Sequence, residues 1–117
     1  MLYTAQYRYP GPDRLDITVK GQNMIGKWFA PTWDMVMGVK NKTTTEQQYT
    51  DLYFEHLLRN WMNYPEAKEA TELVVKRATE GDVTFVCFCP AGAFCHRHLL
   101  VRWFNHNYNL KYGGEKS

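Results

Sequence analysis

The chain has 117 residues, of which 44% are hydrophobic and 22% are charged, and these values are typical of one globular domain and exclude a largely disordered chain. The formal net charge of +2 is well below that of a dedicated DNA-binding domain, so nucleic acid is only weakly supported as a partner. Because the sequence has neither a signal peptide nor an apolar stretch of membrane-spanning length, we expect a cytoplasmic protein with no membrane contact.

The first third of the chain predicts two short strands and an ordered loop. Residues 2–9 are rich in Tyr and alternate loosely, as a strand does, and a Pro-Gly-Pro turn at residues 10–12 ends them. Residues 15–20 alternate apolar and polar side chains, which is typical of a half-buried strand. Residues 22–42 are interrupted by Gly and Pro, so we expect a loop with a short helical turn capped by the hydroxyl of Thr32.

Two helices follow. Thr44 or Thr45 is a candidate N-cap with a Gln three residues later, and apolar side chains then recur at helical spacing from residue 49 to residue 62. Pro65 occupies a first helical position and Gly81 follows the last apolar residue of the next helical pattern, as expected at the two ends of a helix.

The last third predicts a strand, a loop and a helix. Residues 83–88 form an almost continuous apolar run, as in a central parallel strand, and a helix is expected from about residue 95 to residue 108. Alternating helices and strands indicate the α/β class. We therefore expect a single small Rossmann-like domain over residues 1–112, with a short, mostly parallel sheet flanked by helices, and a flexible tail over residues 113–117.

The residues best suited to chemistry lie at this strand-loop-helix junction. In a reducing compartment, the clustered thiols of Cys87, Cys89 and Cys95 indicate metal, redox or catalytic use. The helix N-terminus and Arg97 predict an anion site, and Gly92 would allow the backbone to approach an anion closely. A helix N-terminus also lowers the pKa of nearby thiols, so Cys95 is the best-placed nucleophile and Cys89 the second, whereas Cys87 is expected to pack as a small apolar group.

Zinc is an alternative use of the same segment. Its soft ligands would come from Cys87, Cys89, Cys95, His96 and His98. The spacing argues against such a site, because strand residues two apart lie roughly 6 to 7 Å apart along the strand. Cys87 and Cys89 would need a turn between them to share a metal, and no Cys-x-x-Cys pair is present. We therefore assign no metal ligand and no cofactor, and a zinc-stabilised fold stays an alternative.

A second polar cluster occupies the turn after the first strand. If the first strand pairs with residues 83–88, this turn and the loop at residues 89–94 line one cleft. Arg14 would then help to bind an anion, and Asp16 or His96 would move protons. A ring from Tyr7, Tyr9, Trp28 or Trp33 would stack on a base. The alternative is a solvated turn with ordinary charges.

One segment resembles a known family. It reads FVCFCPAGAFCHRHLL and is similar to the strand, loop and Cys-His-Arg helix start of domain-of-unknown-function family 488 (DUF488). The similarity covers residues 66–103, and a weaker one, to small phage and bacterial relatives, extends to residues 7–18 and 29–33. The Cys-His-Arg triplet falls here on residues 95–97, and the position of Cys89 is acidic in many members. The resemblance implies the fold and the site, and it implies no reaction.

Three hypotheses for function follow. The first is a small enzyme or ligand-binding domain that binds or acts on a phosphorylated or nucleotide-like small molecule. The second is a non-enzymatic module for protein or nucleic-acid interaction, in which the Cys-His-Arg segment is structural, and the third is the zinc-stabilised fold. The sequence decides neither whether the protein is an enzyme nor its oligomeric state. The candidate catalytic residues are Cys95, His96, Asp16 and Cys89, and the candidate ligand-binding residues are Arg97, Arg14, Gly92, Tyr7, Tyr9 and Trp33.

Overall fold

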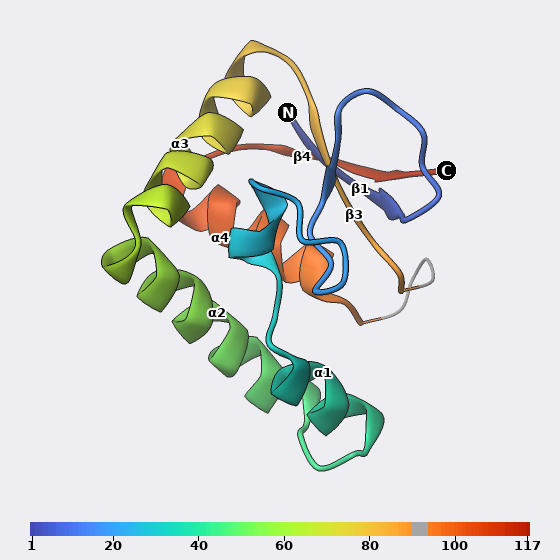
Figure 1. The fold of residues 1–117 in the computed structure, drawn as a ribbon. Coiled ribbons are helices and arrows are strands. Elements are labelled where there is room, and N and C mark those ends of the chain that lie inside the picture. The colour runs from blue at the N-terminus through green and yellow to red at the C-terminus, as the bar shows by residue number, and fades with distance from the viewer. Residues whose placement is uncertain (90–93) are drawn as a thin grey trace.

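The computed structural model describes residues 1–89 and 94–117 (Figure 1). Within these residues, four parallel strands form one sheet in the order β2-β3-β1-β4. The strands are β1 (Leu2–Gln6), β2 (Arg14–Asp16), β3 (Val83–Cys87) and β4 (Tyr112–Lys116). The helices are the 3-10 turn η1 (Gly26–Phe29), α1 (Trp33–Lys40), α2 (Glu46–Asn63), α3 (Pro65–Glu80) and α4 (His96–Tyr108). The predicted α/β class with a parallel sheet is confirmed.

The central pair of strands is β1 and β3. β1 pairs with β3 from Leu2 opposite Val83 to Gln6 opposite Cys87, so the condition set for the shared cleft, that the first strand pairs with residues 83–88, is met. All five residues of β3 are buried, as its continuous apolar run predicts. Because all strands are parallel, the carboxyl ends of β1, β2 and β3 meet at one edge of the sheet, and Cys87 lies at that edge.

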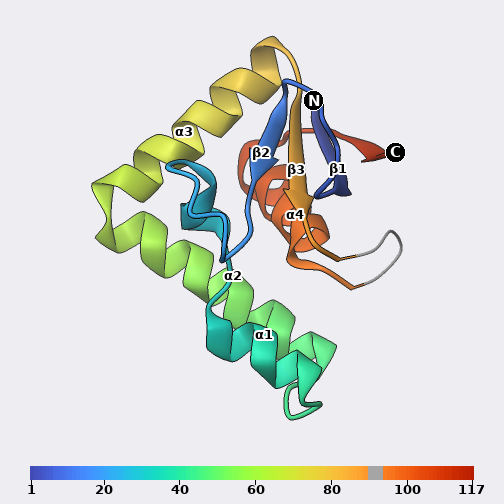
Figure 2. The ribbon, with the colours of Figure 1, turned by 45° about the vertical axis from the view of Figure 1, so that its right-hand side comes forward.

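The hydrophobic core lies between the sheet and the helices, with α4 packed against the sheet. Figure 2 shows α4 behind the sheet, with α2 and α3 as a connected pair beside it. Phe85 of β3 and Phe104 of α4 are both fully buried, and their rings stack with centroids 5.8 Å apart. Tyr53 of α2 is also fully buried, and its hydroxyl donates a 2.6 Å hydrogen bond to the carbonyl of Phe29. No helix among the described residues is long and apolar enough to cross a bilayer.

The helix ends follow the predicted caps. The Thr45 hydroxyl accepts from the backbone N–H of Gln48, and the Gln48 side chain accepts from the backbone N–H of Thr45, which completes the expected capping box. Thr32 caps α1 by accepting from the backbone N–H of Met35 at 3.2 Å. α1 has eight residues and is therefore longer than the short turn that the sequence suggested.

The C-terminal end corrects the expectation of a flexible tail over residues 113–117. Tyr112–Lys116 form β4, which pairs with the otherwise open edge of β1. Its two glycines resemble a linker in the sequence, yet Gly113 lies so close to the Tyr3 ring that a Cβ there would be 2.3 Å from a ring carbon. Glycine at this position therefore permits the strand to pack on β1.

Candidate functional site

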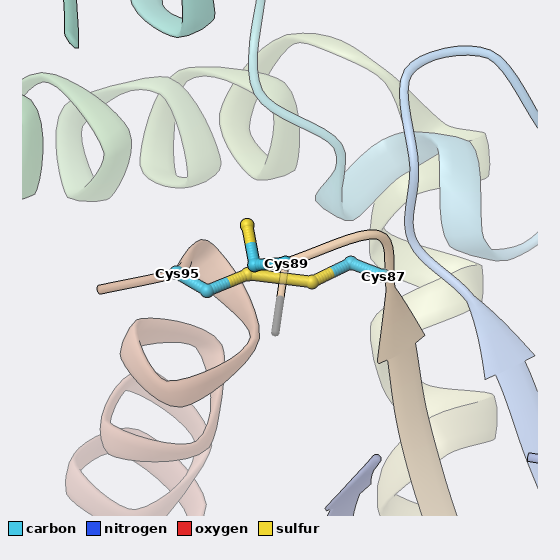
Figure 3. A group of neighbouring side chains, drawn as sticks. All are labelled: Cys87, Cys89 and Cys95. Atoms are coloured by element: carbon cyan, nitrogen blue, oxygen red, sulfur yellow. A yellow bond between two sulfur atoms is a disulfide. The ribbon is translucent and has the colours of Figure 1, made fainter. Parts of the chain in front are cut away.

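The three cysteines come together between β3 and α4. β3 ends at Cys87, the chain bends at Phe88 and Cys89, and α4 begins directly after its N-cap residue Cys95. As a result, all three sulfur atoms lie within 4.8 Å of one another (Figure 3). The prediction that spacing keeps Cys87 and Cys89 apart is wrong, because the strand stops one residue earlier than expected and the bend supplies the missing turn.

Cys87 and Cys95 are buried and are joined as a disulfide in the structure, whereas Cys89 is a half-buried free thiol. The Cα atoms of the joined pair are 8.0 Å apart, beyond the usual disulfide range of about 4.4 to 6.8 Å. Burial raises the pKa of the Cys89 thiol, although the nearby Arg97 charge opposes this. The expected lowering of the pKa of this thiol is therefore wrong, because desolvation outweighs the positive charge.

Arg97 is fully buried next to Cys87. Its guanidinium donates hydrogen bonds to both carboxylate oxygens of Glu115, at 3.2 and 2.8 Å, and to the carbonyl of Cys89 at 2.9 Å. It also lies 3.0 Å from the sulfur of Cys87. Sequence reasoning missed Glu115, because this residue belongs to β4 and the segment was expected to be a tail. The charge of Arg97 is thus matched by a carboxylate of the same chain.

His96 connects the start of α4 to the end of β2. Its Nε2 lies 2.8 Å from the carbonyl of Ile17, so Nε2 carries the proton and donates it. Its Nδ1 lies 3.7 Å from the sulfur of Cys95. Burial lowers the pKa of His96 to about 4, so the ring is neutral at neutral pH and the lone pair of Nδ1 faces Cys95.

A cavity of about 510 Å³ opens beside this cluster. Four of the predicted site residues line it, namely Cys89, Cys95, His96 and, from α1, Trp33. The remaining lining residues come from four parts of the chain and are Thr18, Val19, Lys20, Pro31, Val36, Val39, Lys40, Tyr49, Cys87, Phe88 and Phe94. No sequence pattern marks the two lysines, since only the placement of α1 and of the chain after β2 brings them to the cavity.

In the second predicted cluster, Tyr7 and Asp16 follow or end strands near the same edge, whereas Arg14 begins β2 opposite Thr84, and the side chains of the cluster already have partners. Arg14 donates hydrogen bonds to the carbonyls of Tyr7, at 2.6 Å, and Tyr9, at 2.9 Å. The Tyr7 ring stacks on Phe88 with centroids 4.3 Å apart. Asp16 accepts from the backbone N–H and the hydroxyl of Thr18. Among the described residues that line the cavity, none of these four predicted residues is present.

Two contacts join the clusters, namely the stacking of Tyr7 on Phe88 and the bond between His96 and the Ile17 carbonyl. The roles assigned to these residues stay predictions. Gly92, the remaining candidate, lies outside the described residues.

Comparison with known proteins gives one match. The family model described as "Active DUF488-N3 subclade" matches residues 9–108, a range that includes the three cysteines, the Cys-His-Arg triplet and the cavity-lining residues. No curated protein and no solved structure matches the chain. Because the family model covers well over half of the sequence, this chain belongs to the DUF488 family.

Proposed function

We propose that this protein binds a small ligand that combines an aromatic ring system with an anionic group, as a nucleotide does. The observation that carries the proposal is the cavity of about 510 Å³ at the carboxyl ends of the strands. Its volume falls within the range of small-molecule sites, and this edge of a parallel sheet is where ligands bind in α/β proteins.

Aromatic side chains supply one wall of the cavity. Trp33 of α1 and Phe88 after β3 both line it, and they are 48% and 59% exposed. Large rings that stay exposed at a concave surface offer flat faces for stacking. Trp33 is therefore the residue on which we expect the ring of the ligand to stack, and Phe88, whose ring already stacks on Tyr7, offers a second aromatic surface.

Positive charge supplies the anion contacts. Lys20 and Lys40 both line the cavity, and the Nζ atom of Lys20 lies 5.8 Å from the centre of the Trp33 ring. Cys95, the N-cap residue of α4, also lines it and makes no side-chain cap hydrogen bond, so the first N–H groups of the helix favour an anion at this end. We assign the anion to the two lysines rather than to Arg97, whose guanidinium bonds to Glu115.

The proposal concerns binding, and we propose no reaction. Cys95 is buried, Asp16 bonds to Thr18, and burial raises the pKa of the Cys89 thiol. His96 Nδ1 lies 3.7 Å from the sulfur of Cys95, but a pKa of about 4 makes this imidazole a weak base at neutral pH, so we assign it no proton transfer.

Thermal shift and calorimetry test the proposal with a graded set of probes, namely a nucleoside, its monophosphate, ribose phosphate and inorganic phosphate. The monophosphate is expected to raise Tm most, because it alone supplies both the ring and the charge. Trp33→Ala and Lys40→Ala should each weaken its binding by about tenfold, corresponding to roughly 1.4 kcal/mol. Lys76→Ala, an exposed lysine of α3, is the matched control and should bind as the wild type does.

Two results would overturn the proposal. One is a panel in which no probe raises Tm, or in which both cavity variants bind like the control. The other is an oligonucleotide that raises Tm far more than any mononucleotide, which would instead support the nucleic-acid interaction module.

A further inference from the structure

We propose that Cys87, Cys89 and Cys95 of the reduced protein together bind one thiophilic divalent cation, with zinc as the expected ion. Their sulfur atoms all lie within 4.8 Å of one another. Three thiolates on a tetrahedral zinc, with Zn–S distances of about 2.3 Å, lie roughly 3.8 Å apart, so small side-chain movements suffice to close the site. Among the described residues, no other three Cys, His, Asp or Glu side chains gather in this way.

The backbone favours a metal over a disulfide for the same sulfur atoms. The Cα atoms of Cys87 and Cys95 are 8.0 Å apart even with their sulfur atoms joined, which is wider than the usual disulfide range of about 4.4 to 6.8 Å. A metal ion placed between two sulfur atoms lengthens the bridge, so it fits a wider Cα separation. Cys89 gives a further reason, since a disulfide uses two of the three thiols and a metal uses all of them.

The surroundings of the cluster suit anionic sulfur ligands. Arg97 places a guanidinium N–H 3.0 Å from the sulfur of Cys87, and Glu115 holds this guanidinium from the other side through two hydrogen bonds. Such outer contacts orient ligands in protein metal sites. Cys95 lies at the N-cap of α4, where the helix dipole favours negative charge. Each thiol that binds the cation releases its proton to solvent.

The proposed ion would face the cavity. Cys87, Cys89 and Cys95 all line it, so three protein ligands would leave the fourth tetrahedral position directed at a bound water or ligand. Three protein ligands with one open position are typical of zinc sites that act on substrates, whereas structural sites have four protein ligands. The metal inference does not depend on the nucleotide-like ligand, because the cysteine geometry alone supports it.

Cobalt titration of the full-length, anaerobically reduced protein is the first test. Co²⁺ should produce the thiolate-to-cobalt charge-transfer band and the intense visible bands of tetrahedral cobalt, saturating near one ion per chain, and Zn²⁺ should displace it. Cys89→Ser, at the least buried of the three positions, should weaken binding at least tenfold. His106→Ala, an exposed residue of α4, is the matched control and should titrate as the wild type does.

A second measurement uses only the wild-type chain, so it does not depend on a variant that folds. Alkylation of the reduced protein should be slow at all three cysteines in the presence of Zn²⁺ and faster after a chelator removes the ion. Equal labelling with and without Zn²⁺, or a reduced protein that shows no cobalt spectrum, would overturn the inference. A failed nucleotide panel beside a normal cobalt spectrum would refute only the proposed function.

Discussion

The two polar clusters that the sequence indicates, the turn after β1 and the end of β3, differ in what their side chains contact. The turn after β1 is a closed turn in the sense that its side chains already have partners. Arg14 bonds to backbone carbonyls of the turn, and Asp13 accepts from Tyr9 of the turn, Thr84 of β3 and Lys116 of β4. Around the end of β3, by contrast, Trp33 is exposed beside a cavity. Charged and aromatic residues in a turn therefore do not by themselves mark a ligand site, and the distinguishing property is whether the chain already satisfies them.

The largest expected effect on stability concerns the ion pair between the buried Arg97 and Glu115. Glu115→Ala should lower the free energy of unfolding by about 2 to 3 kcal/mol, because it leaves the fully buried guanidinium of Arg97 without its carboxylate. Urea denaturation measures the change. Glu69→Ala, an exposed position on α3, should change the stability by less than about 0.5 kcal/mol. A Glu115 variant as stable as this control would show that β4 does not hold Arg97.

The next effect tests the closed turn through its pH dependence. Burial raises the pKa of Asp13, but hydrogen bonds from Thr84, Lys116 and Tyr9 together lower it to about 2. Because this pKa is below the unfolded value of 3.8, the stabilisation is complete above pH 3.8 and is lost as the pH falls through about 2.

Asp13→Asn should remove this acid-dependent loss and cost about 1 kcal/mol at neutral pH after allowance for solvent screening. Denaturation curves between neutral and acidic pH measure both quantities. Asp51→Asn, at an exposed position on α2, serves as the control. If Asp13→Asn shows the same acid-dependent loss of stability as the wild type, the closed turn does not contribute in this way.

The smallest expected effect on stability comes from the exposed ring beside the cavity. Trp33→Ala should change the free energy of unfolding by less than about 1 kcal/mol, because the ring is 48% exposed, while it weakens ligand binding. Phe29→Ala, a buried ring of η1, gives the scale for a core aromatic, at about 3 to 5 kcal/mol. A Trp33 variant as unstable as the Phe29 variant would assign Trp33 to the core and remove the contrast between the clusters.

Local patterns in the sequence were sufficient for much of the fold. The almost continuous apolar run at residues 83–88 and the helical spacing after Cys95 predicted the strand-loop-helix unit, although the strand ends one residue earlier, at Cys87. The caps at Thr32 and Thr45 were also predicted, because each depends on hydrogen bonds within one turn of chain.

The remaining features depend on contacts between distant parts of the chain. β4 forms because the edge of β1 is open and Gly113 fits against Tyr3, and nothing in its glycine-rich sequence indicates a strand. The sulfur cluster depends on β3 ending at Cys87 rather than at Phe88, and an apolar run does not specify its last residue. Lys20 and Lys40 line the same cavity only because of where α1 and the chain after β2 lie in the fold.

The sheet order also determines when folding can finish. β1 is translated first, but its two neighbours are β3 and β4, which contain residues 83–87 and 112–116. Both edges of β1 therefore stay without partners until those two segments have been synthesised, and a strand with open edges is prone to pair with other chains. Since these pairings are among the longest in sequence that the chain can make, we expect the sheet to assemble late and cooperatively, after the helices have begun to form.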